Sequence, residues 1–90
     1  MASYKLLIKP SAAKELGALP WALPRKDRSR IVAKVLGLAE SSRPPGSEKL
    51  SGEEKYRLRQ GDYRVLYSIQ DSSATVTIVK IGHRREVYRP

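Results

Sequence analysis

The chain has 90 residues, with 18 lysines and arginines against nine aspartates and glutamates, and a formal net charge of +9 at neutral pH. This length suits one domain, expected to span residues 1–90, and leaves no room for a second core. The absence of cysteine excludes disulfides and thiolate sites, and the single histidine argues against a histidine-based metal site. No apolar run approaches the roughly 20 residues that cross a bilayer, and no signal peptide is recognisable. We therefore expect a cytoplasmic protein without a membrane partner.

The first segment predicts a strand followed by a short helix. Residues 4–9, Tyr-Lys-Leu-Leu-Ile-Lys, have the composition of an apolar strand. Ser11 is expected to cap a helix of about three turns, which Gly17 and Pro20 limit.

A second, longer helix should run over residues 24–41. Ile31, Val35 and Leu38, with Val32, Leu36 and Ala39 beside them, follow the i, i+3, i+4 spacing of one buried stripe. Residues 42–47, Ser-Arg-Pro-Pro-Gly-Ser, are expected to form a loop.

The second half of the chain predicts three strands joined by tight turns. Residues 55–60 and 63–69 alternate apolar and polar side chains on either side of a Gly-Asp turn, and residues 74–81 are rich in β-branched residues. Such short connections make neighbouring strands an antiparallel meander. The order of one strand, a two-helix hairpin and three strands predicts an α+β fold with both helices on one face of a twisted sheet.

The cationic positions of the segment 55–60 fall on one face of the expected strand, and they are Lys55, Arg57 and Arg59. Like charges in a row repel each other, so stability alone gives no reason for them. Charges that blunt an edge strand are the other interpretation, but such edges usually mix signs or use isolated lysines. With Arg64 on the next strand, the row predicts a cradle for a phosphate chain and favours RNA as the partner.

A cationic site of this kind either binds RNA passively or cleaves it. Cleavage by the 2′-hydroxyl needs stabilisation of charge on the phosphoryl oxygens, one group that takes a proton and another that gives one. Arginine does not titrate near neutrality, so the titratable candidates are Lys55, His83 and Tyr88. The like charges around Lys55 favour its neutral amine and hence its use as a base.

His83 and Tyr88 also have simple structural interpretations. His83 follows a glycine and can be a surface or packing residue, and Tyr88 can belong to the core or stack on an RNA base. The acidic residues before the strand are expected to frame the approach to it rather than to form a catalytic carboxylate pair, and they are Glu48, Glu53 and Glu54.

Two segments resemble a known family. Residues 48–52 (Glu-Lys-Leu-Ser-Gly) and 55–67 (Lys-Tyr-Arg-Leu-Arg-Gln-Gly-Asp-Tyr-Arg-Val-Leu-Tyr) resemble the core of RelE-type toxins of the RelE/ParE superfamily. Residues 81–89, Ile-Gly-His-Arg-Arg-Glu-Val-Tyr-Arg, resemble the C-terminal motif of that family. The resemblance spans nearly the whole chain and implies the RelE-like fold. It also implies the toxin of a type II toxin–antitoxin pair, an endoribonuclease that cuts mRNA in the ribosomal A site and halts translation.

The resemblance implies roles for the strand residues. Lys55 and Arg57 fall where the family has two catalytic lysines, so Lys55 remains the candidate base whereas Arg57 keeps only the charge. Arg59 and Arg64 fall at basic positions that hold the phosphate.

The C-terminal motif implies further roles. Arg84 matches an arginine proposed to assist the leaving group, a role that His83 or Arg85 could take instead, and Tyr88 matches a tyrosine that stacks on or orients the substrate base. The expected catalytic set is Lys55, Arg57, Arg64, His83, Arg84 and Tyr88, and the expected substrate-binding set is Arg59, Lys80 and Arg85.

The implied reaction needs no metal ion and no cofactor. The implied partners are a RelB-like antitoxin, the ribosome and mRNA, with operator DNA contacted only through the antitoxin complex. A ParE-like toxin that poisons DNA gyrase without cutting anything is the alternative, because the two activities share one fold. A non-enzymatic RNA- or ribosome-binding module is the third interpretation. The cationic and titratable residues favour cleavage.

Overall fold

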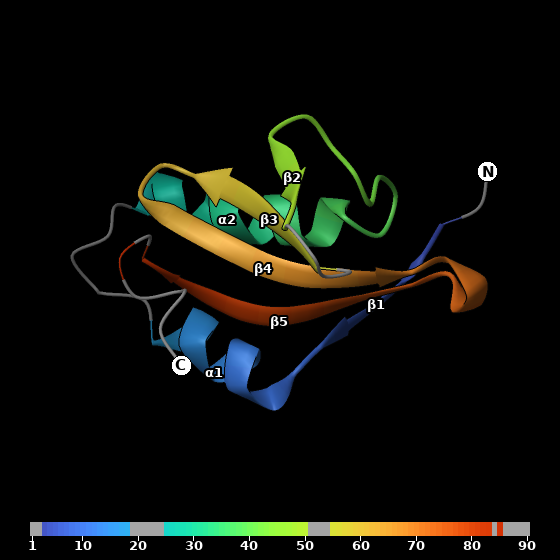
Figure 1. Ribbon diagram of the computed structural model, residues 1–90. Helices are drawn as coiled ribbons and strands as arrows, with labels where there is room; N and C mark the ends of the chain where they lie inside the picture. The colour runs from blue at the N-terminus through green and yellow to red at the C-terminus, as the bar shows by residue number, and fades with distance from the viewer. Residues whose placement is uncertain (1–2, 19–24, 51–54, 84, 86–90) are drawn as a thin grey trace.

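The computed structural model describes residues 3–18, 25–50, 55–83 and 85 (Figure 1). Within them the elements follow the chain as β1 (Lys5–Ile8), α1 (Pro10–Gly17), α2 (Arg25–Gly37), β2 (Ser47–Lys49), β3 (Lys55–Gln60), β4 (Tyr63–Gln70), the 3-10 turn η1 (Asp71–Ser73) and β5 (Thr75–His83). The predicted α+β class, with an N-terminal strand, two helices and a meander of β3, β4 and β5, is confirmed.

The strands form one mixed sheet in the order β1-β5-β4-β3-β2. The neighbours β2 to β5 are antiparallel, whereas β1 lies parallel to β5 at one edge. The opposite edge is β2, which corrects the prediction that residues 42–47 are only a loop, since β2 begins at Ser47. Three polar residues, Ser-Glu-Lys, have no apolar alternation, so only pairing with β3 reveals them as a strand.

The helix α1 differs from the prediction at its start and in its length. Lys9 is the N-cap and makes no side-chain capping bond, and Pro10 opens the helix. Proline suits this position because a first-turn N–H has no helical partner. The predicted cap Ser11 therefore lies inside the helix, which has eight residues, or about two turns.

The helix α2 ends earlier than predicted. Beyond Gly37 the backbone hydrogen bonds join residues three apart instead of four, such as that from the Leu38 N–H to the Val35 carbonyl (3.2 Å). The regular α-helix therefore does not reach residue 41. The predicted start at Pro24 lies outside the described residues. In the part of the chain that the structure describes, no helix has the length and apolarity of a bilayer span.

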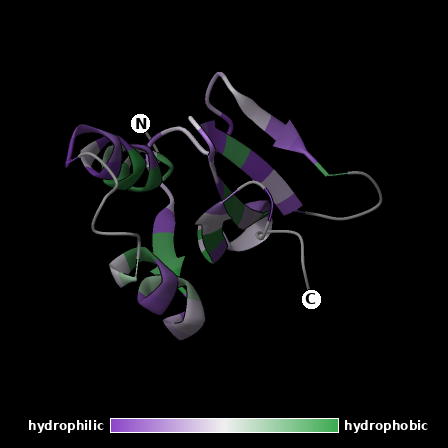
Figure 2. Cartoon of the chain, turned by 90° about the vertical axis from the view of Figure 1, so that its left-hand side faces the viewer, coloured by the Kyte–Doolittle hydropathy of each residue, from purple (hydrophilic) through white to green (hydrophobic). Residues whose placement is uncertain are grey.

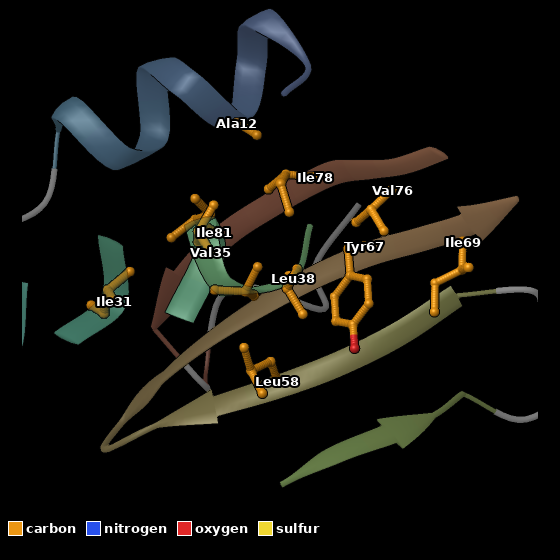
Figure 3. Close-up of a cluster of buried hydrophobic side chains, with 11 residues drawn as sticks. Ala12, Ile31, Val35, Leu38, Leu58, Tyr67, Ile69, Val76, Ile78 and Ile81 are labelled. Atoms are coloured by element: carbon orange, nitrogen blue, oxygen red, sulfur yellow. The ribbon is translucent and has the colours of Figure 1, made fainter. Parts of the chain in front are cut away.

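The core lies between the two helices and one face of the sheet (Figures 2 and 3). The predicted stripe is confirmed for Ile31, Val35 and Leu38, which are buried, whereas Val32 and Leu36 beside them are exposed. The buried residues of the stripe pack with Ala12 of α1 and with apolar residues of β3, β4 and β5, namely Leu58, Val65, Tyr67, Ile69, Val76, Ile78 and Ile81. In the described part of the chain both helices cover this face and neither covers the other, so the other face is the candidate for function.

A β-bulge keeps the core continuous along β5. Tyr67 pairs with Ile78 but its neighbour Leu66 pairs with Lys80, so Val79 is an extra residue in β5. Strict alternation would place Ile78 and Ile81, three residues apart, on opposite faces. The bulge lets both reach the core, where they are at most 2% exposed.

One end of the sheet is held by a network that we call the clasp, formed by Tyr4, Arg43, Tyr56 and Asp71. The Tyr4 hydroxyl donates to the Asp71 carboxylate (2.6 Å), and an Arg43 Nη atom donates to its other oxygen (3.0 Å). Arg43 Nε donates to the Tyr56 hydroxyl (3.1 Å), and its guanidinium lies 5.3 Å from the centre of that ring. The clasp thus joins the residue before β1, the loop before β2, β3 and η1.

Candidate nucleic-acid interface

Cationic side chains gather on the face of the sheet that the helices leave uncovered, which we call the open face. The strand registers place there residues that alternate with the core residues. They include Glu48 of β2; Lys55, Arg57 and Arg59 of β3; Arg64, Leu66 and Ser68 of β4; Lys80 of β5; and, at the far edge, Lys5 of β1. Five of the expected site residues (Lys55, Arg57, Arg59, Arg64 and Lys80) therefore share one surface.

The centre of the open face is a row across four strands. Glu48 pairs with Arg57, Arg57 with Leu66, and Leu66 with Lys80. On one side of this row Arg59 lies opposite Arg64, and on the other Lys55 lies opposite Ser68. Like charges directly opposite each other destabilise a strand pair. The Arg59–Arg64 pair is therefore a feature that binding of an anion explains better than stability does.

Arg64 is the most buried of these cations, with 8% of its surface exposed. Its Nη1 donates to the carbonyl oxygens of Gly61 (2.8 Å) and Tyr63 (2.9 Å) in the turn between β3 and β4. Gly61 has a φ of 59°, the left-handed conformation that glycine adopts readily at the first position of a two-residue hairpin turn. The turn thus fixes the guanidinium at one end of the open face.

Arg57 makes an ion pair with Glu48 across the β2–β3 ladder. The hydrogen bond and the charge of Arg57, with a smaller contribution from Arg59, hold the pKa of the Glu48 carboxyl below its usual value. The Glu48 side chain is 64% exposed and that of Arg57 is 25% exposed, so the carboxylate lies on the outer side of the pair. Glu48 is therefore ionised at neutral pH in the middle of a cationic surface.

The far end of β3 is anchored to the helical layer. Lys34 of α2 donates from Nζ to the backbone carbonyl of Arg59 (2.8 Å). Arg59 itself is exposed. The backbone at this position is thus fixed from the helix side, while the side chain belongs to the open face.

His83 is not brought together with the cations. It pairs with Tyr63, two residues along each strand from the buried pair Ile81 and Val65, and so lies on the helix-facing side of the sheet. Its ring contacts the edge of Tyr63 at a centroid distance of 5.7 Å, and its Nδ1 accepts a hydrogen bond from the backbone N–H of Arg85 (3.2 Å). This arrangement favours the packing interpretation of His83 over a role beside Lys55.

The remaining expected site residues belong to the C-terminal motif. Arg85 is exposed just beyond β5. Arg84 and Tyr88 lie outside the described residues, and their expected roles stay predictions.

Glu48 is the site residue whose position the sequence did not predict. It was expected only to frame the approach to β3, yet it contacts Arg57 directly. Glu48 could have been identified only from the pairing of residues 47–49 with residues 56–58. That pairing could not be predicted, because the sequence did not indicate a strand at residues 47–49.

The open face can hold several phosphates at once. Alternate residues of a strand lie about 6.8 Å apart on one face, so a strand and its neighbour offer a repeating set of cations to an extended polyanion. Arginine binds phosphate with a planar, bidentate fork, and lysine adds a compact charge that can also exchange a proton.

Comparison with known proteins identifies the family. Residues 6–88 match the model described as "ParE toxin of type II toxin-antitoxin system, parDE". The chain is 33% identical to toxin RelG of Mycobacterium tuberculosis over 94 aligned positions, which cover 96% of this chain and 97% of RelG.

Solved structures show the same fold. The archaeal RelE–RelB complex from Pyrococcus horikoshii matches with a TM-score of 0.75 and 28% identity over 93% of this chain and 98% of that one. The intact Escherichia coli RelBE toxin–antitoxin complex matches with a TM-score of 0.69 and 27% identity over 90% and 96% of the two chains. Both relatives were crystallised with their antitoxin. The chain thus belongs to the RelE/ParE superfamily of type II toxin–antitoxin toxins and is RelE-like.

Proposed function

We propose that this toxin is an endoribonuclease that cuts mRNA in the ribosomal A site, without a metal ion or cofactor, and so inhibits translation in the cytoplasm. The observation that carries the proposal is the gathering of Lys55, Arg57, Arg59, Arg64 and Lys80 on the open face. A stable domain gains nothing from such a row, whereas a phosphodiester and its transition state do.

In this reaction the 2′-oxygen loses its proton to a base and attacks the adjacent phosphorus, and the bond from phosphorus to the 5′-oxygen breaks. The 5′-oxygen takes up a proton, so a 2′,3′-cyclic phosphate and a 5′-hydroxyl are left. Negative charge develops on the phosphoryl oxygens, and Arg57, Arg59 and Arg64 are the groups proposed to stabilise it. Lys55 is proposed to accept the proton of the 2′-hydroxyl, since Arg57 cannot titrate near neutrality. Lys80, across Leu66 from Arg57, is proposed to bind a neighbouring phosphate.

The C-terminal motif is proposed to complete the site. Arg84 would assist the departing 5′-oxygen and Tyr88 would stack on a base, while Arg85 would bind substrate. His83 is not assigned the leaving-group role, because its ring lies against Tyr63 on the other face.

The proposed partner in the resting cell is a RelB-like antitoxin. The relatives from P. horikoshii and E. coli were crystallised in toxin–antitoxin complexes. A surface with a net charge of +9 favours an acidic or amphipathic chain that masks the open face. Contact with operator DNA is proposed only through that complex, and purification from the native operon should yield the complex.

Lys55→Arg tests the reaction. The variant keeps the positive charge but loses a group that can give up its proton near neutral pH. We expect the single-turnover rate of A-site mRNA cleavage on programmed ribosomes to fall by roughly two to four orders of magnitude, with ribosome binding nearly unchanged. The matched control is Lys26→Arg, at an exposed position of α2 in the helical layer.

Full activity of Lys55→Arg would remove Lys55 as the proton acceptor. Absence of cleavage by the unmodified toxin, together with inhibition of DNA gyrase, would instead support the ParE-like alternative. A toxin that binds ribosomes and does neither would be the non-enzymatic module.

A further inference from the structure

The ion pair between Glu48 and Arg57 has no evident structural purpose. An exposed pair contributes little to stability, because water screens it and both side chains lose rotamer freedom. The pair also lies in the central row of the open face, with Lys55 and Arg59 on either side of Arg57 along β3 and Lys80 beyond Leu66. A carboxylate at this point lowers the positive potential where the proposed reaction needs it most.

The geometry makes Glu48 a competitor of phosphate. Its carboxylate already occupies donors of the Arg57 guanidinium, and it does so from the solvent side of the pair. An incoming phosphodiester that uses the same donors must displace the carboxylate, and an ionised carboxylate left beside it would repel it. Both effects weaken the binding of any polyanion that is not held in place by other contacts.

We propose that Glu48 is a specificity-determining residue that competes with phosphate for Arg57 and so keeps the toxin from binding free RNA. The inference rests on the proposed phosphate-binding role of the open face. For RNA that the ribosome already positions, the loss of translational and rotational entropy on binding is offset by its contacts with the ribosome. The free-energy cost of displacing Glu48 therefore weakens its binding less. Free RNA has no such help, and for it the carboxylate is a net obstacle.

The test measures the affinity of the toxin for a short 2′-O-methyl RNA, which cannot be cleaved, in the absence of ribosomes. Glu48→Gln keeps the size and polarity of the side chain but removes its charge. We expect Glu48→Gln to bind this RNA roughly two- to fivefold more tightly than the unmodified toxin, the effect expected of one partly exposed charge pair. Its affinity should also fall more steeply with salt, by about 0.7 in the logarithmic slope.

Glu40→Gln is the matched control. Glu40 is exposed in the turn that follows α2, so the variant has the same net charge as Glu48→Gln but leaves Arg57 paired. The second arm is a double-mutant cycle in which Glu48→Gln is repeated in an Arg57→Ala background. There the gain should disappear, because the donors for which Glu48 competes are gone.

An equal gain in Glu40→Gln, or a gain that persists without Arg57, would overturn the proposal. So would a hundredfold loss of cleavage in Glu48→Gln at unchanged RNA affinity, which would make the carboxylate a proton-transfer group. If Glu48 and Arg57 are coupled in the cycle but the toxin does not cleave mRNA on ribosomes, the inference about Glu48 stands and the proposed nuclease activity is overturned. Cleavage without coupling would do the reverse.

Discussion

Two arginine–carboxylate pairs lie at different places on the same sheet. Arg43 and Asp71 lie within the clasp, where Tyr4 donates to the carboxylate and Tyr56 accepts from the guanidinium. Arg57 and Glu48 lie on the open face, where the next charged neighbours of Arg57 along the strand are cations. The first pair belongs to a clasp that joins four segments of the chain. The second pair joins two adjacent strands that are already paired.

The surroundings therefore distinguish a structural ion pair from a functional one. In the clasp each polar group has a partner of complementary chemistry, so removing one leaves others unsatisfied. On the open face the pair lies among like charges, so removing Glu48 strengthens a surface for anions. This contrast predicts that stability and activity respond to opposite substitutions.

The largest expected effect comes from exchanging the two arginines for alanine. Arg57→Ala should lower the rate of A-site mRNA cleavage by about 10²–10³-fold, as loss of one preorganised donor to the transition state does elsewhere. Arg43→Ala should leave that rate within about twofold. Single-turnover cleavage on programmed ribosomes measures both variants.

Thermal unfolding should rank the same two variants in the opposite order. Arg43→Ala should lower Tm by about 2–5 °C, because it opens the clasp, and Arg57→Ala should lower it less. If both variants lost activity and stability in proportion, the distinction between the two pairs would be wrong.

The second prediction concerns pH and the clasp. Arg43 and, to a lesser extent, Tyr4 hold the pKa of Asp71 below its usual value. A carboxyl whose pKa is lower in the folded state stabilises the fold above its unfolded pKa, near 3.9, and this stabilisation is lost as the pH falls through the lowered folded value. Asp71→Asn should therefore lower Tm at neutral pH by about 2–4 °C, and this deficit should shrink below about pH 4.

Circular dichroism melts of Asp71→Asn and the unmodified toxin, from about pH 7 to about pH 2, measure that difference. Glu48 titrates in both proteins, so its contribution cancels. A deficit that stays constant with pH would mean that the Asp71 charge does not stabilise the clasp.

The smallest expected effect is a change in salt dependence. Arg59→Ala should reduce the logarithmic salt slope of RNA binding by about 0.7, the contribution of one contact with a single-strand phosphate. Arg43→Ala should leave the slope unchanged, because its guanidinium is committed to Asp71 and Tyr56. Fluorescence titrations at several salt concentrations test this, and equal slopes for the two variants would return Arg59 to an ordinary solvated surface.

Much of the fold could be predicted because its signals are local. The alternation in β3 and β4 has period two with opposite chemistry on the two faces, and the stripe of α2 repeats with helical spacing. The position of β1 beside β5 could not be predicted in this way, because nothing in either strand specifies a partner more than 60 residues away. Val32 and Leu36, next to the stripe, are 36% and 59% exposed, so apolar character alone did not define the buried face.

The site could be predicted only where alternation is regular. Lys55, Arg57 and Arg59 share a face because β3 has no irregularity. Glu48 was not predicted as their neighbour, since it depends on a polar strand without a sequence signature. His83 was grouped with the cations because it is near them in the sequence, but the register of β5 places it against Tyr63.

The bulge at Val79 in β5 reverses the alternation of side chains between the two faces of the sheet for every residue that follows it. Counted from Val76 and Ile78 without the bulge, Lys80 would point into the core and His83 would join the cations. Because the bulge takes up Val79, Lys80 lies on the open face and His83 lies on the helix side. The presence of the bulge thus decides which side chains of β5 can contact a phosphate. Deletion of Val79 should therefore remove the bulge and leave Lys80 and His83 on their present faces, whereas a regular strand that kept Val79 would exchange them.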